Sequence, residues 1–290
     1  MLLAAAVCPH PPLLIPAAMG AAGLGNPGLG DPALGDSVLG DSVLGDAGPA
    51  GARRQDAARS DTDTGGHDAD AELRELRACC ADAVNGLLAA GPDLLVVVGG
   101  APASAAYDGY AAGSLREYGV PFAVGSGKPV LPLSLTVGVW LLDQAAREPG
   151  AGEARRVQLH AVAADMPTAD CLRLGAELAA LAPRVALLAM GDACARKATG
   201  VPGAADPAAE RYDAQVAAAL AAGDARGLAR LDPALDDELM IAGRAAWQVL
   251  AGAAGDGALR GRLRCALAPY DVSYLVASWD RDRRAAALAD

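Results

Sequence analysis

Short apolar runs alternate along this chain with longer segments in which apolar residues recur at helical spacing. Residues 2–7 form the first run, which ends at prolines, as a buried strand does where its backbone can no longer donate hydrogen bonds. Apolar strands that alternate with helices predict a three-layer α/β/α fold with a central mixed, largely parallel sheet. Further strands are expected at 93–98, 157–163, 184–190, 263–267 and 272–277, and helices at 73–88, 133–146, 168–181, 207–222 and 234–254.

One segment departs from this alternation. Residues 24–48 repeat a five-residue unit that begins with Leu-Gly, and the chain from there to Asp70 is rich in Gly, Asp, Thr and Ala without periodicity. Such a composition buries too little apolar surface to offset the entropy of ordering. We therefore expect one domain over 1–290 that contains a disordered, low-complexity insertion at 20–70.

The composition of the chain indicates which binding partners and which cellular compartment to expect. The formal net charge is −11, which disfavours nucleic acid because phosphate binding needs a concentrated basic face. The apolar N-terminal run is too short for a signal peptide and lacks a basic flank, so no membrane partner is expected. Six cysteines occur without a Cys-x-x-Cys spacing, which is typical of a reducing cytoplasm. The sequence leaves a homodimer open.

Residues suited to chemistry stand at three expected strand ends. His10 follows the first run and is flanked by prolines, the segment 99–104 follows the second, and Asp192 and Cys194 follow a later strand. If these strands are parallel neighbours, their loops open on one edge of the sheet, where α/β proteins place their ligands. Glu238 could reach the same crevice from the last long helix. Asp192 and Cys194 are thus the candidate catalytic residues, and His10 and Glu238 the candidate metal ligands.

Each of these residues also has a plainer explanation. His10 fits a surface loop, and Asp192 after Gly191 fits a turn or helix cap. Cys194 fits a small buried thiol, because free cysteines are usually buried and inert. Glu238 fits an exposed acidic residue near a helix N-terminus, where the helix dipole favours it.

Four motifs resemble one known family. They are Cys-Pro-His-Pro-Pro-Leu-Leu-Ile-Pro at 8–16, Asp-Leu-Leu-Val-Val-Val-Gly at 93–99, Met-Gly-Asp-Ala-Cys-Ala-Arg at 190–196 and Pro-Tyr-Asp-Val-Ser-Tyr-Leu-Val at 269–276. Together they resemble the catalytic B-type chains of class III extradiol ring-cleavage dioxygenases, whose relatives include the Memo-like proteins. The resemblance covers most of the chain outside the insertion.

The resemblance implies ferrous iron held by two histidines and a carboxylate, with open positions for a catechol-type aromatic and dioxygen. A further histidine would act as acid or base. His10 matches the first metal histidine. The glutamate ligand falls near Glu238, although the local alignment equally places Met240 or Ile241 there.

The chain departs from the family at two of its histidines. Gly-Ala-Pro at 100–102 stands where the second metal histidine belongs, and Cys194-Ala195 stands where the acid/base histidine belongs. Only His67, in the low-complexity tract, and His160, within an expected strand, remain. A histidine inside a strand is usually a core or face residue.

Several functions therefore stay open. One is extradiol ring cleavage with Fe(II), and a second is a repurposed or degenerate relative that binds a small ligand or protein in the same crevice without a cofactor. A mixed set of nitrogen, oxygen and sulfur donors would suit zinc better than oxygen-activating iron. Finally, Cys194 could be a nucleophile activated by His10.

Overall fold

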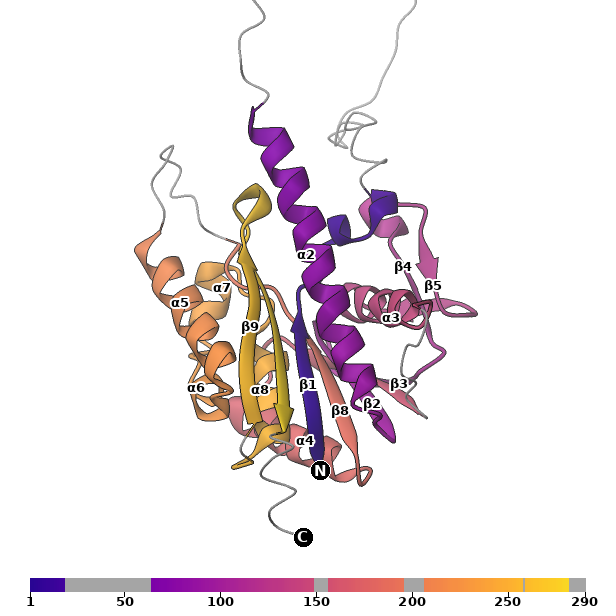
Figure 1. Cartoon of the computed structure of the whole chain (residues 1–290), viewed down its shortest axis with the longest axis vertical. Coiled ribbons are helices and arrows are strands. Elements are labelled where there is room, and N and C mark those ends of the chain that lie inside the picture. Colours follow the sequence, from indigo (N-terminus) through magenta and orange to yellow (C-terminus); the bar gives the residue numbers. More distant parts are fainter. Residues whose placement is uncertain (19–63, 149–155, 196–205, 258, 282–290) are drawn as a thin grey trace, which may run out of the picture.

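The computed structural model describes residues 1–18, 64–148, 156–195, 206–257 and 259–281. Within these residues a seven-stranded sheet has the order β3-β7-β2-β8-β1-β10-β9 (Figure 1). Its strands are β1 (Leu2–Cys8), β2 (Leu94–Ala101), β3 (Ala105–Asp108), β7 (Val157–Ala163), β8 (Val185–Met190), β9 (Leu259–Leu267) and β10 (Tyr274–Arg281). The four strands β7, β2, β8 and β1 run parallel, whereas β3, β10 and β9 pair antiparallel with their neighbours.

Helices cover both faces of this sheet. The helices are α2 (Thr64–Ala89), α3 (Leu133–Ala145), α4 (Thr168–Ala180), α5 (Pro207–Ala222), α6 (Ala225–Ala229), α7 (Leu235–Leu239) and α8 (Arg244–Ala254). Figure 1 shows α2 crossing one face of the sheet, whereas α4, α5, α6 and α8 lie on the opposite face of the sheet. The expected three-layer α/β/α fold with a mixed, largely parallel sheet is thus confirmed.

The central strands read as continuous apolar runs because both of their faces are buried. In β1, Ala4 and Ala6 belong to the core on the α2 and α3 side, while Ala5 and Val7 belong to the core on the α4, α5 and α8 side. Alternate side chains of a strand point to opposite faces, so a strand between two helical layers needs apolar residues at every position.

A small second sheet lies between β3 and α3, where the sequence analysis expected neither a strand nor a helix. Strands β4 (Ala112–Ser114), β5 (Ala123–Val124) and β6 (Pro129–Leu131) pair in the order β5-β4-β6. The strands are two or three residues long, too short for alternation of apolar and polar residues to reveal them. Gly113 is required here, since a β carbon at this position would collide with Thr136.

Two helix boundaries differ from the sequence expectation. Helix α2 begins at Thr64, earlier than residue 73, and the rest of the expected insertion, 20–63, lies outside the described residues. The single helix expected over 234–254 is wrong. It is interrupted between α7 and α8, where Met240 adopts a left-handed conformation (φ 53°) and Ile241 forms a β-bridge with Cys194. Tertiary pairing with the 191–195 segment therefore overrides the helical pattern.

None of the described helices is both long and apolar enough to cross a lipid bilayer.

Candidate functional site at the carboxyl edge of the sheet

The carboxyl ends of β1, β8 and β2 lie side by side. Met190 of β8 is in register with Cys8 of β1 on one side and with Gly99 of β2 on the other. Neighbouring strands are about 4.8 Å apart, so the three following loops leave the same edge of the sheet at short intervals. The arrangement that the sequence analysis required for a shared crevice is present.

His10 and Asp192 meet at this edge. The backbone N–H of His10 donates to Asp192 Oδ1 at 2.7 Å, and the ring atom Nδ1 of His10 lies 3.6 Å from the same oxygen. The His10 side chain is buried, with 7% of the residue exposed, and its Nδ1 has no hydrogen-bond partner among the described residues. The Asp192 carboxylate, just beyond hydrogen-bond distance, is thus the polar group of the described residues that faces this nitrogen.

Tyr274 of β10 borders the same carboxylate. Its side chain is buried, and burial together with the negative charge of Asp192 raises the pKa of the phenol well above its ordinary value. Tyr274 therefore keeps its proton at every physiological pH, and it contributes a neutral phenol beside Asp192.

At the position where the resemblance implies a second metal histidine, the surrounding residues leave little room for a side chain. At Gly100, a β carbon would lie 3.0 Å from the carbonyl oxygen of Ala242, and at Gly99 it would collide with Ser134. The Ser134 hydroxyl donates to the Gly100 carbonyl oxygen at 2.8 Å, which fixes this arrangement. A larger side chain at Gly100 would have to displace the Ala242 backbone.

Cys194 is buried below the loop. Its sulfur lies 3.7 Å from the carbonyl oxygen of Ala209 in α5, and its backbone N–H donates to Asp213 Oδ1 at 3.1 Å. Ser273 donates its hydroxyl proton to the other oxygen of Asp213, and its backbone N–H to the carbonyl oxygen of Cys194 at 3.0 Å. These contacts fit a small thiol that fills space where the 191–195 segment joins α5 and β10.

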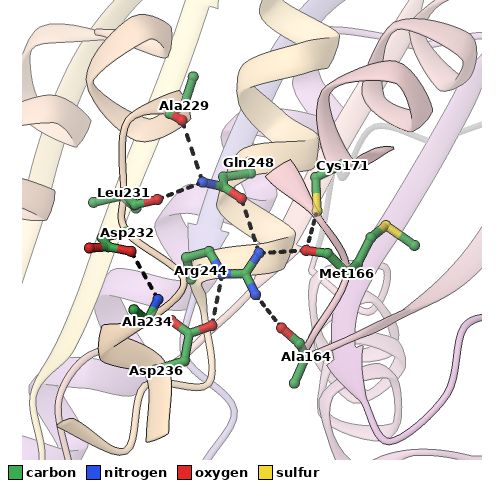
Figure 2. A network of polar contacts seen from close by, with 10 residues as sticks. All are labelled: Ala164, Met166, Cys171, Ala229, Leu231, Asp232, Ala234, Asp236, Arg244 and Gln248. Carbon is green, nitrogen blue, oxygen red and sulfur yellow. Dashed lines mark hydrogen bonds and ion pairs between the residues drawn. The ribbon is translucent and has the colours of Figure 1, made fainter. Parts of the chain in front are cut away.

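Glu238 is exposed on α7, and a buried arginine anchors the segment that carries it (Figure 2). Arg244 Nε donates to Asp236 Oδ2 at 2.7 Å, and Nη1 donates to the Met166 carbonyl oxygen at 2.8 Å. Nη1 also donates to Gln248 Oε1 at 3.1 Å, and Nη2 donates to a further backbone carbonyl. A buried cation is tolerated only with such a full set of acceptors.

The Arg244 network supports the wall of the site. Ala242, two residues before Arg244, donates its backbone N–H to the Asp192 carbonyl oxygen at 3.2 Å. Burial raises the pKa of Asp236 even though the Arg244 guanidinium opposes that rise. Sequence reasoning missed Arg244. The helix expected over 234–254 placed this residue in its middle, and the available signal was a lone charge within the otherwise apolar segment 241–247.

The described residues do not fit the iron site that the resemblance implies. His10 and Asp192 bring a nitrogen and a carboxylate together, but no three His, Cys, Asp or Glu side chains in the described part of the chain are grouped so that they could hold a metal ion. His160 lies on β7, and the side chain of His67 is outside the described part. The mixed donor set considered for zinc meets the same obstacle.

A hollow of about 740 Å³ opens at the end of β2. Its walls come from residues 100–103, from the small sheet and from the start of α3. Tyr118 and Val130, which are about half exposed, supply apolar surface, and Arg116 supplies a cation. Glu117 lines the hollow beside Arg116, and the proline and tyrosine side chains suit the flat face of a small aromatic molecule.

Comparison with known proteins adds little. No protein-family model matches the chain, and no curated protein matches it. Among solved structures, the chain is similar to the crystal structure of the uncharacterized protein JW3007 from Escherichia coli K12, with 19% sequence identity and a TM-score of 0.40. The alignment covers 68% of this chain and 91% of that one. A likeness of this strength carries no argument about function.

Proposed function

We propose that this protein is a repurposed relative of the extradiol dioxygenases, which binds a small aromatic molecule at the carboxyl edge of β1, β8 and β2 without iron-dependent ring cleavage. One observation carries the proposal. His10 and Asp192 meet at this edge, yet within the described ranges no third donor joins them in a metal site.

The groups at the edge are suited to holding an aromatic acid or phenol. The His10 imidazole and the Asp192 carboxylate face each other at this edge, with Nδ1 and Oδ1 3.6 Å apart. The hollow at the end of β2, whose lining does not include His10 or Asp192, offers Tyr118 for stacking and carries both Arg116 and Glu117. In this arrangement Asp192 is a positioning residue, since it fixes the backbone and faces the ring of His10.

An extradiol dioxygenase would bind ferrous iron, whereas the proposed function requires none. Purified protein would be incubated anaerobically with ferrous iron, freed of excess metal and measured by elemental analysis. Binding of catechol would then be measured by calorimetry on the metal-free protein, and dioxygen uptake on the iron-treated sample. We expect less than stoichiometric iron, saturable catechol binding and no dioxygen uptake above the level of buffer.

Two variants sharpen the distinction. Tyr118→Ala removes stacking surface and should weaken catechol binding about tenfold. His10→Ala removes the imidazole at the edge of the sheet and should weaken catechol binding by no more than about tenfold. Stoichiometric iron in the wild-type protein that is lost in His10→Ala, together with dioxygen uptake on catechol, would replace this proposal with the dioxygenase.

A further inference from the structure

A second hollow, of about 570 Å³, lies on strands β3 and β7. Strand β3 is the outermost strand on this side of the sheet (Figure 1). The hollow is lined by polar side chains of both strands, among them His160, which the sequence analysis treated as a core or face residue.

The register places the polar residues on one face. Asp108 of β3 is opposite Gln158 of β7, and Ala106 is opposite His160. Arg156 lies two residues before Gln158, and its carbonyl oxygen still accepts from Leu95 of β2, so the backbone there is extended. Because side chains alternate along a strand, Arg156 shares the face of Gln158 and His160. It is therefore a diagonal neighbour of Asp108, with a Cβ separation of roughly 7 Å.

The two opposite charges in the hollow do not pair. Within the described residues no ion pair joins Arg156 to Asp108, although both line the hollow. Asp108 Oδ1 accepts the backbone N–H of Tyr110 at 2.8 Å, which holds the carboxylate in place. An exposed cation and an exposed anion thus line one hollow without an ion pair between them in the described part of the chain, so both can contact a ligand.

The remaining polar groups are neutral. His160 is half-buried, and burial lowers the pKa of its imidazole, so the ring is uncharged at neutral pH. Its Nε2 lies 3.5 Å from Gln158 Oε1, at the limit of a hydrogen bond. The imidazole and the amide therefore keep hydrogen-bonding capacity for another group, and they add no net charge to the hollow.

We propose that this hollow binds a small zwitterion of the α-amino acid class, whose carboxylate pairs with Arg156 and whose ammonium group pairs with Asp108. A ligand with both charges matches a wall with both charges, whereas a simple anion or cation would meet one attractive and one repulsive group. The site is separate from the proposed aromatic site. The two hollows share only Tyr107 among the residues that line them, so either proposal can fail without the other.

The three histidines of the chain make a direct test possible. Protein labelled at histidine would be followed by nuclear magnetic resonance, with the ring signals assigned from single His→Gln variants. Glycine is the probe, and acetate and methylammonium at matched ionic strength are its half-ligands. We expect glycine to shift the His160 signals saturably, with a dissociation constant on the order of millimolar, and to leave His10 unshifted.

Variants identify the contacts. Arg156→Gln and Asp108→Asn should each weaken glycine binding at least about tenfold, and Arg156→Lys should retain part of it. Arg226→Gln is the matched control, because Arg226 is an exposed arginine paired with Asp256 away from the hollow. Circular dichroism would verify that each variant is folded. The proposal is overturned if glycine gives no saturable shift, if acetate alone binds as tightly, or if Arg156→Gln binds glycine like the wild-type protein.

Discussion

The backbone N–H of His10 donates to Asp192 Oδ1 at 2.7 Å across 182 positions of sequence, and the His10 ring lies 3.6 Å from the same oxygen. One carboxylate therefore fixes the loop after β1 and faces its imidazole. The contact joins two strand ends that the chain itself keeps far apart, so both the stability of the fold and the geometry of the candidate site depend on it.

Loss of the Asp192 carboxylate should loosen the β1 loop. Asp192→Ala removes a charge-assisted acceptor from a buried N–H, so we expect the free energy of unfolding to fall by about 2–3 kcal/mol. Asp192→Asn keeps an acceptor oxygen and should cost about 1 kcal/mol. Urea unfolding measures both, and Asp170→Asn on the exposed face of α4 serves as control. Equal losses in the two Asp192 variants would show that the acceptor oxygen is unimportant.

The Arg244 network should behave as a buried ion pair. Arg244→Met leaves Asp236 buried without its cation, so we expect a loss of about 3–5 kcal/mol of unfolding free energy. The double variant Arg244→Met/Asp236→Leu removes both charges and should recover much of that loss. Denaturant unfolding of Arg244→Met, of Asp236→Leu and of the double variant gives the coupling energy between the two residues. Additive effects would mean that the pair contributes nothing as a pair.

His160 should give the protein a pH-dependent loss of stability. Burial lowers its pKa in the folded state below the ordinary value of 6.5, so the unfolded chain takes up the proton first as the pH falls. Stability from this group is complete above pH 6.5 and declines below it, until the folded state also becomes protonated. His160→Gln should abolish that part of the decline. Unfolding curves measured from neutral pH down to about two units below the ordinary histidine pKa test this, and identical slopes for the two proteins would contradict it.

Alkylation should distinguish the cysteines. Cys194 is fully buried, whereas Cys79 is only half-buried on α2. Burial and contact with Cys79 raise the pKa of the Cys265 thiol, which slows its reaction. We therefore expect iodoacetamide to label Cys79 first and Cys194 only on opening of the fold, as peptide mass spectrometry would record. Labelling of Cys194 ahead of the other cysteines would instead support the thiol-dependent chemistry.

A histidine placed at Gly100, where the resemblance implies a metal ligand, should not create a metal site. A side chain at Gly100 points toward the Ala242 carbonyl oxygen, so we expect Gly100→His to lower the unfolding free energy by about 1–3 kcal/mol. Iron should remain below stoichiometric level in this variant, as elemental analysis would show. Gly86→His, at an exposed glycine of α2 where an added β carbon would meet only the end of the Arg264 side chain at 3.7 Å, controls for the loss of a glycine. Tight iron binding by Gly100→His would show that the Ala242 segment yields easily.

The amino-acid sequence determined the layers of the fold, because burial on both faces leaves a direct record in composition. Strands β1, β2 and β8 are apolar at nearly every position. The prolines, glycines and apolar spacing in and around α3, α4 and α5 indicate where these helices begin and end. The same reasoning placed His10, the 99–104 segment and Asp192 at strand ends. It missed β4, β5 and β6, because a strand of two or three residues is too short to show an alternation of apolar and polar positions.

Only the tertiary structure decided which of these residues meet. The His10 contact with Asp192 depends on β1 and β8 being neighbours in the sheet, and the break between α7 and α8 depends on pairing of Ile241 with Cys194. The placement of Arg156 and Asp108 on one face of the sheet likewise follows from the β3–β7 register. Local propensity and hydrophobic period act over a few residues, whereas these contacts join segments that are distant along the chain. The sequence therefore specified the scaffold, and the long-range packing of that scaffold specified the sites.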